Sequence, residues 1–85
     1  MRDHAAYAGA MVLYSRGDNA RALDELARVA RALPQYADVH RGLGMACERA
    51  GKKGEAADAY ARTLQLDPAD IAARNGLERS SGGNP

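Results

Sequence analysis

The chain has 85 residues, and its 12 lysines and arginines nearly balance 11 aspartates and glutamates, which leaves a net charge of +1. A chain of this size buries only roughly 60 to 65% of its unfolded surface, enough for one small domain of marginal stability. Because so small a net charge creates no long-range field for phosphate groups or anionic lipids, we expect no nucleic acid and no membrane surface as a partner.

The first predicted helix runs from Arg2 to Arg16 and is closed by Gly17. Its apolar stretch, Ala5 to Tyr14, follows a basic residue and could imitate the start of a signal peptide. Asp3 interrupts that basic start, and the stretch aligns with a helix later in the chain, which favours a structural helix. No part of the sequence approaches the roughly 20 apolar residues that a transmembrane helix needs.

The second predicted helix runs roughly from Ala20 to Leu33, and Asp18-Asn19 supplies N-cap chemistry before it. Apolar residues recur along it at helical spacing, with charged residues on the other side, so the helix is amphipathic. Pro34 ends the helix because proline cannot continue it, and Gln35-Tyr36 forms a short link to the next segment.

The stretch from residue 37 to residue 70 predicts a helical hairpin. His40, Leu43 and Cys47 lie three and four residues apart, so they share one face of a helix. Ala56 and Tyr60 share a face of the next helix in the same way. The apolar faces of the two helices can therefore pack against each other.

Small residues complete this hairpin. Gly44 and Ala56 are small where the two helices would cross, which leaves room for Tyr60. Gly51 lies between the two periodic segments, where a left-handed helix C-cap is least costly for glycine.

Asp67-Pro68 marks both an end and a start. Pro68 cannot continue the second helix of the hairpin, so that helix should stop near Leu66. Aspartate followed by proline is also favoured at a helix start, so a fifth helix should begin near Pro68 and reach about Arg79. Ser80 to Pro85 has no apolar anchor and is expected to be disordered.

The chain repeats itself after 34 residues. The shift superposes identical residues in pairs that include Met11 and Met45, Gly17 and Gly51, Ala22 and Ala56, Asp24 and Asp58, Ala27 and Ala61, Arg28 and Arg62, and Pro34 and Pro68. The glycine, alanine and proline pairs provide the bends and packing sites that a repeated hairpin needs. The first copy is weaker, with Ala6, Gly9, Ala10 and Leu13 in place of His40, Leu43, Gly44 and Cys47, and Leu26 in place of Tyr60.

The second copy resembles the tetratricopeptide repeat. The family's 34-residue pattern places an aromatic residue, Leu-Gly and Tyr on one helix, Ala and an aromatic residue on a second, and then Pro. The matching residues here are His40, Leu43-Gly44, Cys47, Ala56, Tyr60 and Pro68. The resemblance implies an all-α fold, a right-handed α-solenoid of two helix-turn-helix repeats plus a short C-terminal capping helix.

The corresponding domain would span residues 1–80, followed by a disordered tail at 81–85. Its parts would be a first repeat at about 3–36, a second repeat at about 37–70 and a capping helix at about 69–79.

No residue pattern predicts catalysis, a metal site or a cofactor, and we expect no enzyme. His40 and Cys47 are the one pair that could suggest a base and a nucleophile, but seven helical residues separate them by about 10.5 Å. His4 lies on a different helix from His40, without a nearby cluster of ligands. The single cysteine cannot form an intrachain disulfide, which fits a reducing compartment, and we expect a cytoplasmic protein.

The resemblance also implies a groove, lined by the first helices of successive repeats, that holds an extended or helical peptide. Two tyrosines and two methionines would form its adaptable apolar floor. The alternative is that Tyr7 or Tyr14 packs against a neighbouring helix or a second subunit. Carried onto this sequence, the partner-binding groove consists of Tyr7, Met11, Tyr14, Arg41, Met45, Glu48, Arg49, Asn75 and Arg79.

Tetratricopeptide domains that clamp the acidic C-terminus of a chaperone use lysine, asparagine and arginine along this groove. The matching places here hold Tyr7, Met11, Gly42, Ala72 and Gly76. We therefore expect a partner with an apolar or mixed segment and not a clamped chaperone tail.

The predicted function is that of a non-catalytic adaptor or scaffold that binds a partner protein or peptide. An alternative is a small secretion-type chaperone that sequesters an apolar segment of an exported subunit. Repeat arrays generally need about three repeats, and this chain has two and a fragment, so self-association into a homo-oligomer is also expected.

Overall fold

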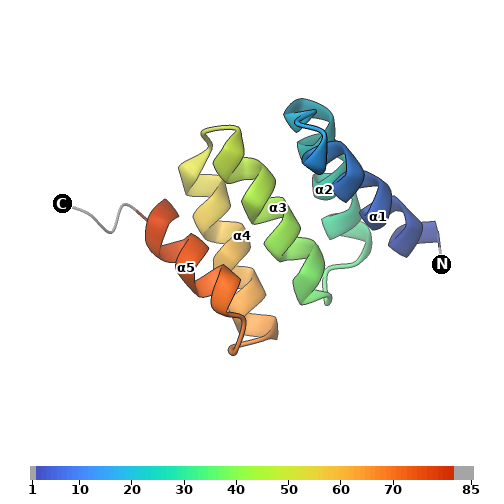
Figure 1. Ribbon diagram of the computed structural model, residues 1–85. Helices are drawn as coiled ribbons and strands as arrows, with labels where there is room; N and C mark the ends of the chain where they lie inside the picture. Colours follow the sequence, from blue (N-terminus) through green and yellow to red (C-terminus); the bar gives the residue numbers. More distant parts are fainter. Residues whose placement is uncertain (1, 82–85) are drawn as a thin grey trace.

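A computed structural model describes the backbone of residues 2–81 and the side chains of residues 5–81. The described chain is all helical, with no strand (Figure 1). The predicted tail lies outside the described residues except for Ser81. The five helices are α1 (Arg2–Ser15), α2 (Asn19–Ala32), α3 (Ala37–Arg49), α4 (Lys53–Leu66) and α5 (Ile71–Ser80).

Glycine ends the first helix of each hairpin, as the sequence predicts. Gly17 and Gly51 have φ angles of 82° and 80°, in the left-handed region that glycine adopts without steric cost. The following amide closes each bend: Asp18 N–H donates to Leu13 O at 3.0 Å, and Lys52 N–H donates to Cys47 O at 2.8 Å. The two bends are therefore repeats of one Schellman-type turn.

The second helix of each hairpin also ends in a repeated way. Helix α2 ends at Ala32 and α4 at Leu66, and the next residue in each case donates its amide to a carbonyl four residues back at 2.7 Å. Both ends precede a proline by two residues. The predicted stop near Leu66 is confirmed.

The predicted start of the fifth helix is wrong by three residues. Helix α5 begins at Ile71, and its N-cap is Asp70, whose carboxylate accepts a hydrogen bond from Ala73 N–H at 2.9 Å. Asp67 instead caps the end of α4 and belongs to a turn in which Asp70 N–H donates to its carbonyl at 3.1 Å. The predicted cap was Asp67 alone, whereas the turn at residues 67–70 places Asp70 directly before α5.

Two smaller expectations also change. Asp18 is the N-cap residue of α2, but its side chain makes no capping hydrogen bond and lies 3.7 Å from Arg21. Ser80 is not part of a disordered tail, because it lies within α5 with its side chain buried. It follows Ala73 and Gly76 at helical spacing, so the buried face of α5 extends to the last residue of the helix.

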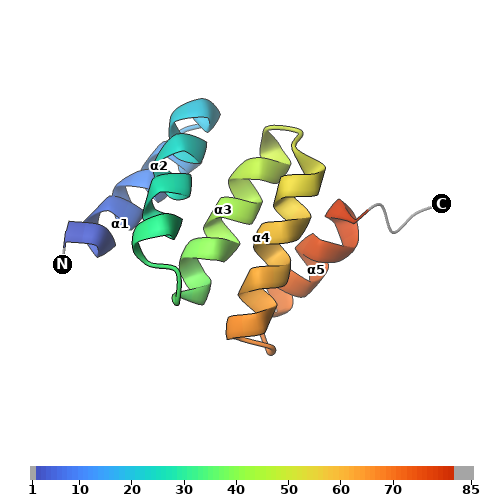
Figure 2. The same cartoon turned by 180° about the vertical axis from the view of Figure 1, so that it is seen from behind.

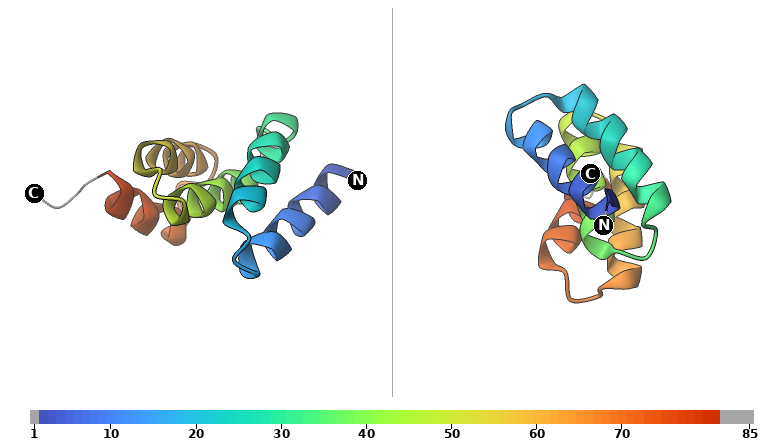
Figure 3. Two further views of the ribbon diagram at one scale, coloured as in Figure 1. Left: turned by 90° about the horizontal axis from the view of Figure 1, so that it is seen from above. Right: turned by 90° about the vertical axis from the view of Figure 1, so that its right-hand side faces the viewer.

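The helices stack in chain order, each against the next, with α1 and α5 at opposite ends of an elongated molecule measuring 41 × 25 × 17 Å (Figure 3). Helix α3 also contacts both α1 and α5, whereas no Cα atoms of α2 and α4 come within 8 Å. The stack is therefore tighter on the side of α1, α3 and α5. We call the surface that these three helices form the inner face; Figure 1 looks onto it and Figure 2 shows α2 and α4 from behind.

The core of the second hairpin is built on the ring of Tyr60, which is completely buried. A Cβ atom added to Gly44 on α3 would lie 2.8 Å from this ring, and one added to Gly76 on α5 would lie closer still. The ring therefore occupies the space that side chains on α3 and α5 would need. The predicted role of Gly44, room for Tyr60, is confirmed.

The same contact recurs one repeat earlier with different side chains. Leu26, the counterpart of Tyr60, is completely buried and clusters with Ala10, the counterpart of Gly44. A Cβ atom on Gly42, the counterpart of Gly76, would lie 3.4 Å from Leu26, an ordinary contact. The second hairpin thus accepts the larger Tyr60 where Gly44 replaces Ala10.

Replacing Gly76 by alanine should destabilise the fold because the added methyl group would collide with the Tyr60 ring. We expect Gly76→Ala to lower the free energy of unfolding in urea by about 1–3 kcal/mol, even though alanine favours a helix over glycine by up to about 1 kcal/mol.

Gly9→Ala on α1 is the matched control, since nothing lies within 4 Å of its Cβ position. That variant should be as stable as the parent or up to about 1 kcal/mol more stable. The loss at Gly76 should shrink in a Tyr60→Leu background, and an equal loss in both backgrounds would contradict the steric explanation.

Candidate functional site

The residues predicted to line a groove all lie on α1, α3 and α5, the helices of the inner face. Two of them turn inward. Tyr7 and Met11 are half-buried, and they approach the Cβ position of Gly42 on α3 to 3.3 and 3.2 Å. Glycine at position 42 therefore lets α1 rest on the backbone of α3, and these two side chains fix that contact while keeping part of their surface exposed.

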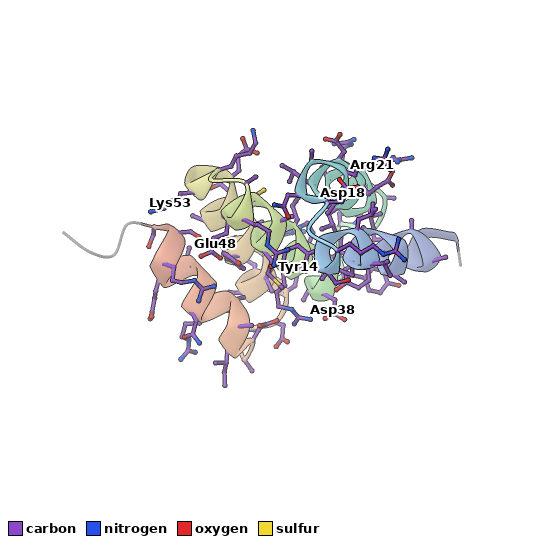
Figure 4. The ribbon with its side chains drawn as sticks, turned by 45° about the horizontal axis from the view of Figure 1, so that its top comes forward. Tyr14, Asp18, Arg21, Asp38, Glu48 and Lys53 are labelled. Carbon is purple, nitrogen blue, oxygen red and sulfur yellow. The ribbon has the colours of Figure 1, made fainter. Side chains whose placement is uncertain are left out.

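Tyr14 and Arg49 form the second link between α1 and α3. The guanidinium carbon of Arg49 lies 3.6 Å from the centroid of the Tyr14 ring, and its Nη1 donates to the Tyr14 carbonyl at 2.6 Å. Helix α1 has no basic residue in its own last turn, so Arg49 supplies the positive charge that the carbonyl end of a helix favours. Figure 4 shows Tyr14 where the two helices meet.

Glu48 connects three helices. Its carboxylate accepts a hydrogen bond from the Tyr60 hydroxyl at 2.8 Å and two from Arg79, at 2.7 and 3.1 Å. The hydrogen bonds from Arg79 lower the pKa of Glu48, more than burial raises it. Burial and the neighbouring carboxylate raise the pKa of Tyr60, so its hydroxyl is held as a donor. Both oxygens of Glu48 are therefore used inside the molecule.

Arg41 makes the corresponding link at the other end of α5. It donates to the N-cap residue Asp70 at 2.6 Å and lies 3.4 Å from Asp38 on its own helix. Burial alone would raise the pKa of Asp70, but the hydrogen bonds from Ala73 N–H and Arg41 outweigh it, and the pKa is lowered. The Asp70 carboxylate thus caps α5 and ties it to α3 at once.

Met45 and Asn75 complete the predicted set. Met45 is half-buried and packs against the cluster around Tyr60, while Asn75 is exposed on α5. No enclosed pocket forms among residues 5–81. The predicted residues therefore form an open surface with an apolar floor and four charged side chains, three of which are engaged in ion pairs.

His40 and Cys47 are packing residues. The His40 ring is 2.8 Å from the Pro34 carbonyl, and Cys47 is buried, which raises the pKa of its thiol, as does the nearby Glu55. In the part of the chain with described side chains, no three His, Cys, Asp or Glu residues come together as metal ligands.

Sequence reasoning missed Asp70 and Tyr60 as organisers of this face. The signal for Asp70 was present, because an aspartate directly before an apolar helix start is the usual N-cap. Tyr60 was expected in the core, and nothing in the pattern of its own helix indicates that its hydroxyl would reach Glu48.

Stacked helical hairpins with repeated bends and an open inner face define a helical repeat protein. The family model described as Tetratricopeptide repeat matches residues 7–71, so the chain belongs to the tetratricopeptide repeat family. Comparison with curated proteins gives no match. Among the described residues, no helix has both the length and the apolar character that crossing a membrane requires.

Acid should loosen α5 because the carboxylates that hold it have lowered pKa values in the folded state. Unfolded aspartate and glutamate titrate near about 3.9 and 4.3, so the stabilisation is complete above roughly pH 5 and is lost as pH falls through the lower folded values. Thermal melts should therefore be flat from about pH 7 to 5 and fall below about pH 4.

Asp70→Asn separates the two roles of this carboxylate. Asparagine keeps the N-cap but not the ion pair with Arg41, so the acid decline should be shallower than in the parent chain. Asp70→Ala should lose about 1 kcal/mol more at neutral pH. An acid profile of Asp70→Asn that parallels that of the parent would contradict the assignment.

Proposed function

We propose that the chain is a non-catalytic interaction module that binds a partner protein or peptide through its inner face. Tetratricopeptide repeats generally mediate protein–protein interaction, and this chain belongs to the family. The partner would offer an apolar or mixed segment to the residues of α1, α3 and α5 named above. A right-handed superhelix and repeat boundaries at about 3–36 and 37–70 stay predictions.

The observation that carries the proposal is the way the inner face is held. Arg49, Glu48 and Arg41 each bond across helix boundaries, so their positions are fixed before any partner arrives. A preorganised surface loses less side-chain entropy on binding than a mobile one. Met45, half-buried among these fixed groups, supplies an adaptable apolar contact.

Self-association is the second part of the proposal. Val12 on α1 and Ile71 on α5 are 46% and 69% exposed, so apolar side chains stand free on both end helices. A secretion-type chaperone would use the same inner face for an apolar segment of an exported subunit. Co-purification with such a subunit, and not with folded proteins, would favour the chaperone.

Capture of a partner should depend on Met45. The immobilised full chain is used to retain proteins from cells that express it, followed by mass spectrometry, and Met45→Ala should reduce recovery of the specific partner about tenfold or more. Tyr7→Ala should weaken it too, and because Tyr7 and Met45 both pack against neighbouring side chains, the fold of both variants is checked by circular dichroism.

Arg31→Gln is the control, because Arg31 is exposed on α2, outside the inner face. Arg31→Gln should capture as much of the partner as the parent chain does. If Met45→Ala and Arg31→Gln capture equal amounts of the partner, the inner face is not the binding surface.

Light scattering checks self-association. We expect a molar mass above that of one chain at micromolar concentration, because a stack of only two hairpins and one helix leaves apolar surface on its end helices uncovered. Ile71→Asp should shift the mass toward the monomer. A parent chain that is strictly monomeric and unfolds cooperatively at that concentration would contradict this part of the proposal.

A further inference from the structure

The three arginines predicted on the inner face are not equivalent. Arg41 is paired with Asp38 and Asp70, and Arg79 with Glu48. Arg49 is exposed, and no carboxylate lies within 4.0 Å of it among the residues whose side chains are described. One guanidinium on this face thus lacks the anionic partner that the other two have.

Arg49 is nevertheless held in place. Its flat face lies on the Tyr14 ring, and one N–H is used by the Tyr14 carbonyl. Stacking uses the face of a guanidinium and leaves the N–H groups along its edge, of which there are five. Arg49 is therefore a positioned cation with donors to spare, the arrangement that binds a carboxylate through two parallel hydrogen bonds.

The surroundings of Arg49 indicate what kind of ligand would carry the carboxylate that it binds. Met45 precedes Arg49 by one helical turn, so the apolar contact and the cation lie about 6 Å apart along α3. Alternate residues of an extended chain are spaced by roughly 6.6 Å, and residues four apart on a helix by about 6 Å. A segment with an apolar residue and an acidic residue at either spacing would reach both groups.

We propose that Arg49 is a specificity anchor for an internal aspartate or glutamate of the partner segment, one step from an apolar residue that contacts Met45. This inference rests on the proposed function and adds the chemistry of the ligand. The occupant is a protein segment of mixed acidic and apolar character.

A purely structural role for Arg49, capping α1, makes a different prediction. A cap affects the stability of the fold and is indifferent to the charge of a ligand. An anchor makes the chain prefer an acidic peptide over its uncharged isostere, and that preference weakens as salt screens the charges. The Glu-against-Gln preference therefore separates the two roles.

The test uses the full chain and two pairs of fluorescein-labelled peptides built on an Ala/Ser background. One pair carries Leu-Xaa-Glu or Leu-Xaa-Gln, and the other places the same residues four apart. Fluorescence anisotropy should show one Glu peptide binding about tenfold more tightly than its Gln isostere, the gain expected of one bidentate charged contact.

Arg49→Gln should abolish this preference, Arg49→Lys should keep part of it, and Arg31→Gln should leave it intact. Arg49→Lys retains the positive charge at the end of α1, so it keeps the test valid if Arg49→Gln is poorly folded. Circular dichroism confirms folding at the temperature used.

Equal binding of Glu and Gln peptides to the parent chain, no binding of either, or a preference that persists in Arg49→Gln would overturn the inference. The proposed function would still hold after any of those outcomes if Met45→Ala captures less partner than the parent chain. If Met45→Ala captures as much partner as the parent chain, the proposed function itself is contradicted.

Discussion

The fold of the second hairpin depends on one aromatic ring between two glycines. Tyr60 lies on α4, and its ring fills space against Gly44 of α3 and Gly76 of α5, so one side chain sets how closely three helices approach. The hydroxyl extends the same constraint to the surface, because it donates to Glu48, which in turn holds Arg79. One residue thus links the packing of the core to the positions of Glu48 and Arg79 on the inner face.

The first hairpin solves the same packing problem with different volumes. Leu26 stands where the second hairpin has Tyr60, and Ala10 stands where it has Gly44, so a larger side chain is matched by a smaller neighbour. Gly42 keeps its place in the interface, but there it receives Met11 and Tyr7 from α1 as well as Leu26. Interiors are close-packed, so positions in contact can differ between repeats only when their combined volume is conserved. This explains why the first copy looks weak residue by residue and still folds as a repeat.

The sequence predicted the features that depend on neighbouring residues, and it did not predict those that depend on contacts between distant residues. The bends at Gly17 and Gly51 and the helix end near Leu66 were predictable because backbone conformation and proline act within a few residues. The start of α5 was placed three residues early, because Asp67-Pro68 has the local sequence of a helix start, whereas Asp70 is the cap and is also bonded to the distant Arg41. The pairs that shape the inner face join residues 29, 31 and 35 positions apart, close to one repeat length. Periodicity within a helix places such residues on one face but does not say which atoms meet across the stack.

These internal pairs also limit what the inner face can recognise. A partner carboxylate that displaced Asp70 from Arg41, or Glu48 from Arg79, would exchange one charged hydrogen bond for another and leave a carboxylate of this chain unpaired. Such an exchange gains little and costs the hold on α5, since leaving a partly buried charge without a partner is more unfavourable than never pairing it. Selectivity must therefore come from groups that the fold has positioned but not saturated. Arg49 and Met45, which both lie on α3, meet that condition. We therefore expect a partner to contact α3 on the side where Arg49 meets Tyr14 of α1, and to leave the ion pairs between α3 and α5 intact.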